Sequence, residues 1–286
     1  ADGHVDGDRI VCPYHGWEYQ ADGRTGRVPE PKNFVPFERE TLCLPNYRVE
    51  SVGQLVLVHV GDAPQPLSAF FGSDFYGWLE ERFGEQWSLS LKWHPEYPAN
   101  WKVPIENSLE AYHVPAVHPH TFKRTPSEND SEHLLLGNRT AFGTSLPFSP
   151  HSRLDALFQR LEGRVVRLLG HTDTRRYWQH HVFPNLLFSF TDAISLCQCI
   201  MPTGPTTCRA VVRQFGRLPK TAGPVASPLA WLWSQFTAAL NKHILKEDLS
   251  MFSCIQRGLE RSPHAGILGR CEERLHAFQL FMQQRS

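Results

Sequence analysis

The stretch NWKVPIENSLEAYHVPAVH, residues 100–118, combines a helical pattern with two carboxylates and two histidines. Proline is favoured in the first turn of a helix, so the pattern predicts a short helix over residues 104–113. On this helix Glu106, Glu110 and His113 follow one another at i, i+4 and i+7, and therefore share one face. The apolar residues between them fall on the opposite face. The stretch thus predicts a polar helix face that presents a carboxylate and an imidazole together.

His118 extends this arrangement. Pro115 should end or kink the helix just after His113, so that His118 folds back toward the same point. Two neutral imidazoles and one carboxylate on one side of an iron leave positions open for dioxygen and substrate, which is the facial triad of non-haem Fe(II) oxygenases. The alternative is that both histidines are incidental residues of a polar surface. The spacing alone leaves both interpretations open.

A carboxylate that could complete such a triad lies in the long amphipathic helical pattern that starts at Ser227. Asp248 lies four residues after Ile244 and four before Phe252, so it interrupts an apolar stripe that faces the core. A buried carboxylate is costly unless a cation or hydrogen-bond donors hold it. We therefore expect Asp248 to be the third ligand. Glu247 is the second choice, and a solvated acid at the edge of the stripe is the alternative.

The rest of the chain predicts an α+β protein. The first forty-odd residues are dense in Gly, Pro and Asp with short apolar runs between, which is typical of a small β domain. The segment GQLVLVHV, residues 53–60, predicts a further strand. Residues 177–190, 194–202 and 207–215 are rich in β-branched and aromatic side chains and predict consecutive antiparallel strands. A last amphipathic stretch covers residues 272–282.

The hexapeptide CPYHGW, residues 12–17, places a thiolate and an imidazole three residues apart in a turn bounded by Pro and Gly. Both side chains of Cys12 and His15 can then point at one metal-containing centre. A bare C-x-x-H is a weak signal, because such pairs arise by chance. The alternative is that both residues are structural parts of a β turn.

Composition excludes several other classes of function. The 286 residues contain 29 Lys plus Arg and 29 Asp plus Glu, so the formal net charge is zero. A neutral chain without a basic run gives no reason to expect nucleic acid or an anionic membrane as partner. Seven cysteines without a regular framework favour a reducing compartment, such as the cytoplasm, over a disulfide scaffold. No G-x-G-x-x-G follows a strand, so a dinucleotide site is not expected.

Taken together, N-W-K, E-N-x-x-E-x-Y-H-x-x-x-x-H and the C-P-Y-H-G-W loop resemble the oxygenase α subunit of the Rieske non-haem iron oxygenases. The resemblance covers nearly the whole chain. It implies a partial, all-β Rieske [2Fe-2S] domain over residues 1–48. An antiparallel-sheet helix-grip catalytic domain would follow over residues 49–286. It further implies that His113, His118 and Asp248 hold Fe(II), and that Cys12 and His15 form the second ligand loop of the cluster.

The sequence departs from the family pattern upstream of Cys12. Rieske domains contribute a first C-x-H loop, but no such pattern precedes Cys12, where only His4 lies without a cysteine partner. We therefore expect the chain to start inside the Rieske domain, with the first loop further upstream. The chain as given carries half of the ligands of the cluster.

The resemblance also implies the reaction and its partners. Electrons from NAD(P)H would reach the cluster through a separate reductase, with or without a ferredoxin, and would serve the activation of O2 at the mononuclear iron. The substrate would be a small aromatic compound or amine that is hydroxylated or dealkylated. Glu110 would link the two centres across a subunit boundary of a homotrimer, and Asn107 would line the iron pocket. Glu110 resembles the members that act on quaternary amines.

An apolar substrate pocket is expected between residues 122 and 190. The candidates for its walls are Phe142, Phe148, Phe183 and Phe188, although aromatic residues on strands are usually core. Two other functions stay open at this point. One is a Rieske-type electron carrier, which would need only about a hundred residues. The other is a non-catalytic helix-grip protein that binds a small molecule.

Overall fold

The computed structural model describes residues 4–61, 65–122, 124–147, 153–264, 266–269 and 271–284. The chain divides into two compact units, Ala1–Gly72 and Ser73–Ser286. None of the described helices is long and apolar enough to span a membrane.

The first unit is built from short antiparallel strands. One sheet has the order β1-β2-β3, and a separate hairpin pairs β4 with β5. The bounds are β1 His4–Asp6, β2 Arg9–Val11, β3 Glu18–Gln20, β4 Arg48–Val52 and β5 Leu55–His59, with the short helices η1 Pro31–Asn33, η2 Arg39–Thr41 and α1 Leu67–Phe71. The strand expected over residues 53–60 is confirmed as β5.

The turn between β2 and β3 carries Cys12 and His15. The Cys12 N–H donates to the Trp17 carbonyl at 2.8 Å, and the Gly16 N–H donates to the Cys12 carbonyl at 3.0 Å. Gly16 has a φ of 70°, a conformation that glycine adopts at no steric cost. The sequence CPYHG therefore closes a tight loop at the tip of two strands, with Cys12 half-buried and His15 exposed.

The second unit is organised around an eight-stranded antiparallel sheet with the order β6-β13-β12-β11-β10-β9-β8, in which β7 also pairs with β13. The bounds are β6 Trp87–Trp93, β7 Glu96–Tyr97, β8 Ser131–Leu136, β9 Arg139–Ser145, β10 Arg176–Val182, β11 Leu186–Phe190, β12 Ile194–Gly204 and β13 Thr207–Arg217. The predicted antiparallel sheet is confirmed. The stretch expected over residues 177–190 forms two of its strands rather than one.

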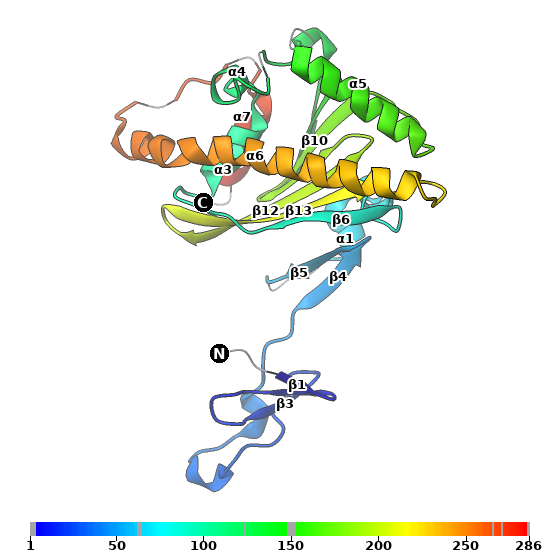
Figure 1. The fold of residues 1–286 in the computed structure, drawn as a ribbon. Helices are drawn as coiled ribbons and strands as arrows, with labels where there is room; N and C mark the ends of the chain where they lie inside the picture. Colours follow the sequence, from blue (N-terminus) through cyan, green and yellow to red (C-terminus); the bar gives the residue numbers. More distant parts are fainter. Residues whose placement is uncertain are drawn as a thin grey trace. The chain divides into compact units, whose positions relative to one another are not determined.

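Helices pack on the sheet and enclose a cavity. Their bounds are α2 Ser73–Arg82, α3 Lys102–Leu109, α4 Val114–Val117, α5 Arg153–Leu168, α6 Ala226–Arg261 and α7 Glu273–Gln283, with η3 at Glu128–Asp130. Figure 1 shows the long helix α6 lying across the sheet, where it packs on β13 and β6. Helix α7 packs on β8 and β9. Because these two helices cover different strands, the strands between them are free to form the floor of a cavity.

Two contacts fix this arrangement. A Cβ added to Gly216 of β13 would lie 2.3 Å from the Ser234 Cβ of α6, so glycine permits the close approach of helix and sheet. Further along, Phe252 of α6 and Phe278 of α7 join one apolar core with Ile105 of α3. Burial of such side chains is worth about 1.5–3 kcal/mol each, which anchors all three helices to the sheet.

The helix expected over residues 104–113 is shorter than the sequence pattern suggested. Helix α3 ends at Leu109, and Glu110 is extended with φ −125° and ψ 166°. The Glu110 carboxylate accepts hydrogen bonds from the backbone N–H groups of Tyr112 and His113, the latter at 3.1 Å. These bonds replace the hydrogen bonds that a further helical turn would make. Pro115 does not end a helix but lies in the first turn of α4. Glu106, Glu110 and His113 therefore do not share one helix face.

Candidate iron centre

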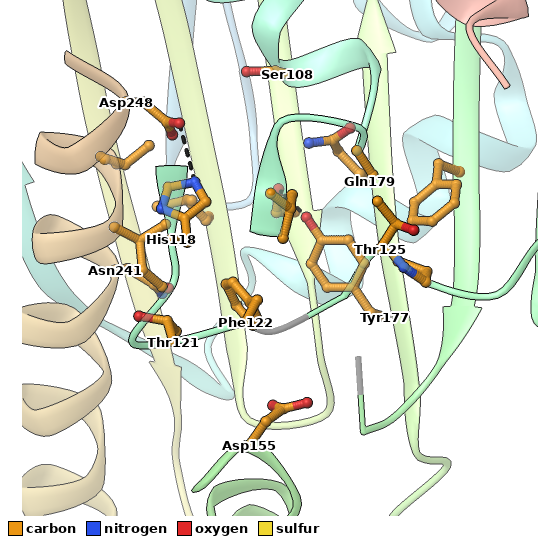
Figure 2. A pocket seen from close by; sticks show the side chains of 18 of the residues that line it. Ser108, His118, Thr121, Phe122, Thr125, Asp155, Tyr177, Gln179, Asn241 and Asp248 are labelled. Atoms are coloured by element: carbon orange, nitrogen blue, oxygen red, sulfur yellow. Dashed lines mark hydrogen bonds and ion pairs between the residues drawn. The ribbon is translucent and has the colours of Figure 1, made fainter. Parts of the chain in front are cut away.

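Three side chains of the second unit converge on one point. His113, His118 and Asp248 each offer one ligand atom, and these atoms lie within 4.8 Å of one another. The Asp248 Oδ1 atom is 3.5 Å from His113 Nε2 and 3.1 Å from His118 Nε2. His113 precedes α4 and His118 follows it. Asp248 comes from the middle of α6 and lies next to His118 in Figure 2.

Each histidine is held from behind by a second carboxylate. His113 Nδ1 contacts Glu110 Oε1, and His118 Nδ1 lies 2.8 Å from Glu247 Oε2. A carboxylate oxygen accepts a hydrogen bond, so these contacts place the proton of each neutral imidazole on Nδ1. The Nε2 lone pairs then point toward Asp248. Such carboxylate–histidine pairs are the usual support of metal-ligating imidazoles.

The converging atoms fit a cation. Asp248 Oδ1 is buried and accepts no well-aligned hydrogen bond from any residue of the described ranges. Burial opposes charging of His118, but the negative charges and acceptor oxygens of Asp248 and Glu247 outweigh it, so the pKa of His118 is raised. Positive charge is thus favoured at this point. Two imidazoles and one carboxylate are the donor set that Fe(II) takes in non-haem oxygenases.

Glu247 and Asp248 are neighbours on α6 but hold different positions at the site. Asp248 is 9% exposed and faces both Nε2 atoms. Glu247 lies behind His118 and also pairs with the exposed His243 at 3.4 Å. The geometry therefore supports the preference for Asp248, and it gives Glu247 a role as the partner of a ligand histidine. The ligand assignment itself stays a prediction.

We expect Asp248→Asn to lower iron affinity more than Glu247→Gln does. Loss of a ligand charge removes a bond to the metal, whereas loss of a histidine partner typically costs about 10- to 100-fold in affinity. Competition titrations of the purified variants with a chelator measure both affinities, and circular dichroism checks the fold. The reverse order would move the ligand assignment to Glu247.

The centre forms part of the wall of a cavity of about 490 Å³. Figure 2 shows His118 and Asp248 on one side of it and Tyr177 and Gln179, from β10, on another. Asn107 also lines the cavity, and its role beside an iron stays a prediction. The lining is mostly apolar, which suits a small organic ligand.

The expected aromatic walls are only partly correct. Phe142 lines the cavity, but Phe183 and Phe188 are not among its lining residues. Phe183 packs in the core against Phe281 of α7. Phe188 points to the opposite face of the sheet, where it meets Phe75 of α2. Phe148 lies outside the described residues.

The cavity wall also contains a buried acid that the sequence pattern did not indicate. Glu162 of α5 is 5% exposed, and its carboxylate accepts a hydrogen bond from the Thr191 hydroxyl. Burial raises its pKa to about 7, and the nearby charge of Asp192 acts in the same direction. The signal available in the sequence was weak, because Glu162 looks like an ordinary polar residue of an amphipathic helix.

We expect Glu162→Gln to stabilise the chain at pH 8 more than at pH 5. In the unfolded chain the carboxyl ionises near its ordinary pKa of 4.5, whereas in the folded chain it ionises near 7. Stability is therefore lost as pH rises through this window, on the order of 2–3 kcal/mol. Urea unfolding at both pH values measures the difference. Glu96→Gln, at a side chain 70% exposed, is the control and should show no such pH-dependent gain.

The cluster loop and the iron centre lie in different units, and the structure describes each by itself. Within the described parts of the chain, the group at His113, His118 and Asp248 is the one set of three or more His, Cys, Asp or Glu that could hold a metal. Cys12 and His15 belong to no such set within these residues. Their assignment as cluster ligands stays a prediction.

Two imidazoles and one carboxylate beside a cavity are the donor set typical of mononuclear non-haem iron proteins. Comparison with known sequences gives the family. The catalytic-domain pattern described as "Ring hydroxylating alpha subunit" matches residues 84–285, and the Rieske [2Fe-2S] domain pattern matches residues 1–48. The chain belongs to the family of ring-hydroxylating oxygenase α subunits. The resemblance inferred from the motifs and the α+β fold class are thereby confirmed.

Named relatives include enzymes that act on quaternary amines. The chain is 25% identical to the chloroplastic choline monooxygenase of Amaranthus tricolor over 96% of its length and 58% of the relative's. It is 28% identical to the carnitine monooxygenase oxygenase subunit of Acinetobacter pittii, over 38% of this chain and 30% of the relative. The chain thus spans about 58% of the choline monooxygenases it matches from end to end.

Solved structures show the same fold. A quaternary ammonium Rieske monooxygenase superposes with a TM-score of 0.72 at 18% identity, covering 98% of this chain and 73% of the other. Naphthalene 1,2-dioxygenase superposes with a TM-score of 0.60 at 19% identity, covering 90% and 63%. At these identities the likeness concerns the fold alone.

Proposed function

We propose that the chain is the terminal oxygenase component of a Rieske-type mono- or dioxygenase. In this proposal His113, His118 and Asp248 hold a mononuclear non-haem Fe(II), and a small organic substrate occupies the adjoining cavity. The observation that carries the proposal is the convergence of two imidazole Nε2 atoms and an otherwise unbonded carboxylate oxygen at the cavity wall. When bound, the iron would supply reductive activation of dioxygen, because three protein ligands leave coordination positions open.

The protein's own contribution is to orient ligands and exclude water. Glu110 and Glu247 fix the tautomer and the direction of the two imidazoles. The side chain of His118 is 3% exposed, so bulk water has little access to this ligand. The substrate is positioned by the mostly apolar cavity, whose walls include Phe122, Phe142 and Tyr177.

We further propose that electrons arrive from a Rieske [2Fe-2S] cluster, of which Cys12 and His15 supply half of the ligands. Glu110 would connect the two centres between neighbouring subunits of a homotrimer. An NAD(P)H-dependent reductase or a ferredoxin would reduce the cluster. The cytoplasm is the proposed location, because seven cysteines without a disulfide framework suit a reducing compartment.

The substrate is proposed to be an amine or an aromatic compound that is hydroxylated or dealkylated. The names of relatives support the amine class, since choline, carnitine and glycine betaine monooxygenases are among them. Naphthalene dioxygenase and dicamba monooxygenase are among the structures with the same fold. Glu110 at the bridging position is the feature of this chain that favours the amine class.

Metal analysis followed by an oxygen-uptake assay tests the proposal. The full-length protein should contain iron and labile sulfide, and should consume O2 with a reductase and a substrate of one of these classes. About one iron per chain without labile sulfide would indicate that the catalytic domain alone is assembled. A protein that binds candidate substrates but neither holds iron at His113, His118 and Asp248 nor consumes O2 would be a helix-grip binding protein instead.

A further inference from the structure

A buried arginine lines the cavity without a carboxylate partner. Arg274, near the start of α7, is 2% exposed and belongs to the cavity wall. Its Nη1 donates to Gln179 Oε1 at 3.0 Å, and its Nε has a longer contact of 3.4 Å with Thr140 Oγ1. Within the described ranges, its Nη2 has no hydrogen-bond partner and its guanidinium takes part in no ion pair.

This arrangement is costly for the protein alone. Transfer of a guanidinium out of water is strongly unfavourable unless an anion or several acceptors compensate it. Burial lowers the pKa of Arg274 to about 10. The acid next in sequence, Glu273, is directed elsewhere, with Oε1 3.4 Å from His133 Nδ1. The charge of Glu273 acts on Arg274 only from a distance, so the guanidinium has two neutral oxygen acceptors and no ion-pair partner beside a cavity suited to a small organic ligand.

We propose that the substrate carries a carboxylate and that Arg274 binds it, an inference that rests on the oxygenase function proposed above. The guanidinium supplies the charge-assisted donor at Nη2, and such donors are the preferred partners of carboxylates in proteins. Gln179 lies beside it and already uses its oxygen to accept from Arg274. The side chain of Gln179 also forms a hydrogen bond with Tyr177, so Gln179 holds the guanidinium in place and Nη2 is the donor left for the anion.

Position along the sheet supports a role in substrate binding. Gln179 pairs with Phe142 of β9, and the Arg274 guanidinium lies 5.9 Å from the Phe142 ring centre. This part of the wall is distinct from the iron ligands, as Gln179 and Asp248 lie well apart in Figure 2. An anion held here leaves the rest of the substrate free to extend toward His113 and His118.

The other lining residues of the cavity suit two kinds of carboxylic acid. Asp155 and Glu162 of α5 also line the cavity, and Figure 2 shows Asp155 far from Gln179. Acidic groups in the part of the cavity away from Gln179 would favour a carboxylate that also carries a cationic head, as in a quaternary ammonium acid. The aromatic side chains of the wall would accept an aromatic acid. Both contain the carboxylate that Arg274 requires.

Calorimetric titration with two matched pairs of compounds tests the inference. Glycine betaine and choline share a trimethylammonium head and differ in the carboxylate. Benzoate and benzyl alcohol share a ring and differ in the same way. We expect the iron-loaded chain to bind at least one acid about 10- to 100-fold more tightly than its alcohol, the range for a charge-assisted hydrogen bond. The pair that shows the difference identifies the head group.

Variants show which residue is responsible. Arg274→Gln should remove the preference for the acid, and Arg274→Lys should retain part of it because it keeps the charge. The control is Arg139→Gln, because Arg139 lies on β9 like Phe142 but stacks on Phe75 on the other face of the sheet. This control should keep the full preference. Without ligand, Arg274→Gln should melt at or above the wild-type temperature, because it removes a buried charge that has no ion-pair partner.

Two results would overturn the inference. One is a wild-type chain that binds each alcohol as tightly as its acid, which needs no variant. The other is a preference for the acid that survives Arg274→Gln. Turnover without such a preference would refute this inference alone. A preference for the acid without any oxygen consumption would refute the oxygenase function and leave Arg274 as a carboxylate-binding residue.

Discussion

His113→Ala and His118→Ala should each abolish iron occupancy at the mononuclear site while the chain keeps its fold. Both Nε2 atoms lie within 3.5 Å of Asp248 Oδ1, so each histidine would contribute one of three protein bonds to the metal. Loss of a residue that merely supports a ligand weakens metal binding about 10- to 100-fold, and loss of the ligand itself should exceed this. We therefore expect the purified histidine variants, at micromolar concentration, to contain no iron at this site.

The fold should survive because neither imidazole belongs to the main apolar core, which joins α3, α6 and α7 to the sheet. Iron content by absorption spectrometry and the melting temperature are measured on each variant. His243→Ala is the control, because His243 is 64% exposed and contacts Glu247 rather than Asp248. Full iron content in either ligand variant would remove that histidine from the ligand set.

The sequence could point to these residues as candidate ligands because their pattern is local. His113 and His118 lie five positions apart around a proline, and Asp248 interrupts an otherwise apolar helical stripe. In both patterns, the residues close by in the sequence indicate where the side chain lies. The antiparallel sheet was predictable for the same reason, since β-branched and aromatic runs separated by turns determine strands.

Residues that act through distant partners could not be predicted in this way. Glu247 contacts His118 although 129 positions separate the two residues in the sequence, and Arg274 contacts Gln179 although 95 positions separate them. The faces of the strands present the same difficulty. Phe142 and Phe188 look alike in sequence, but only the placement of α2 on one face and α6 and α7 on the other decides which of them meets the cavity.

The end of α3 shows a different limit. Propensity and spacing favoured a helix through His113, but the Glu110 side chain captures two backbone N–H groups and stops it at Leu109. A side-chain hydrogen bond of this kind competes with the helix over a single turn, which periodicity cannot resolve. The result matters for function, because it turns Glu110 toward the Nδ1 atom of His113 instead of leaving it on a helix face.

Glu110→Gln should leave both metal centres loaded in the full-length protein but stop electron transfer between them. Glu110 contacts His113 Nδ1 and the backbone of the following residues, so it supports a ligand without being one. An amide retains one acceptor oxygen but loses the negative charge that favours the protonated Nδ1. In the proposed bridge this charge lies between two imidazoles, His113 and His15 of the partner subunit.

The bridge requires a particular assembly. A contact from Glu110 of one subunit to His15 of the partner subunit joins two different surfaces, and such head-to-tail contacts close into a ring rather than a two-fold dimer. The proposed homotrimer is the ring that the family resemblance implies. Light scattering of the full-length protein measures the mass of the active species, and an active monomer would contradict the bridge whatever the variant does.

Single-turnover kinetics with a chemically reduced cluster measure the transfer itself, alongside iron and sulfide counts. Glu106→Gln is the matched control, because Glu106 lies on α3 and accepts from Gln279 at 3.3 Å rather than from His113. It should turn over at the wild-type rate. If Glu110→Gln is fully metallated and also reacts at that rate, the charge between the imidazoles is not needed. Glu110 would then serve only to end α3 and to orient His113, and electrons would have to reach the iron by another path.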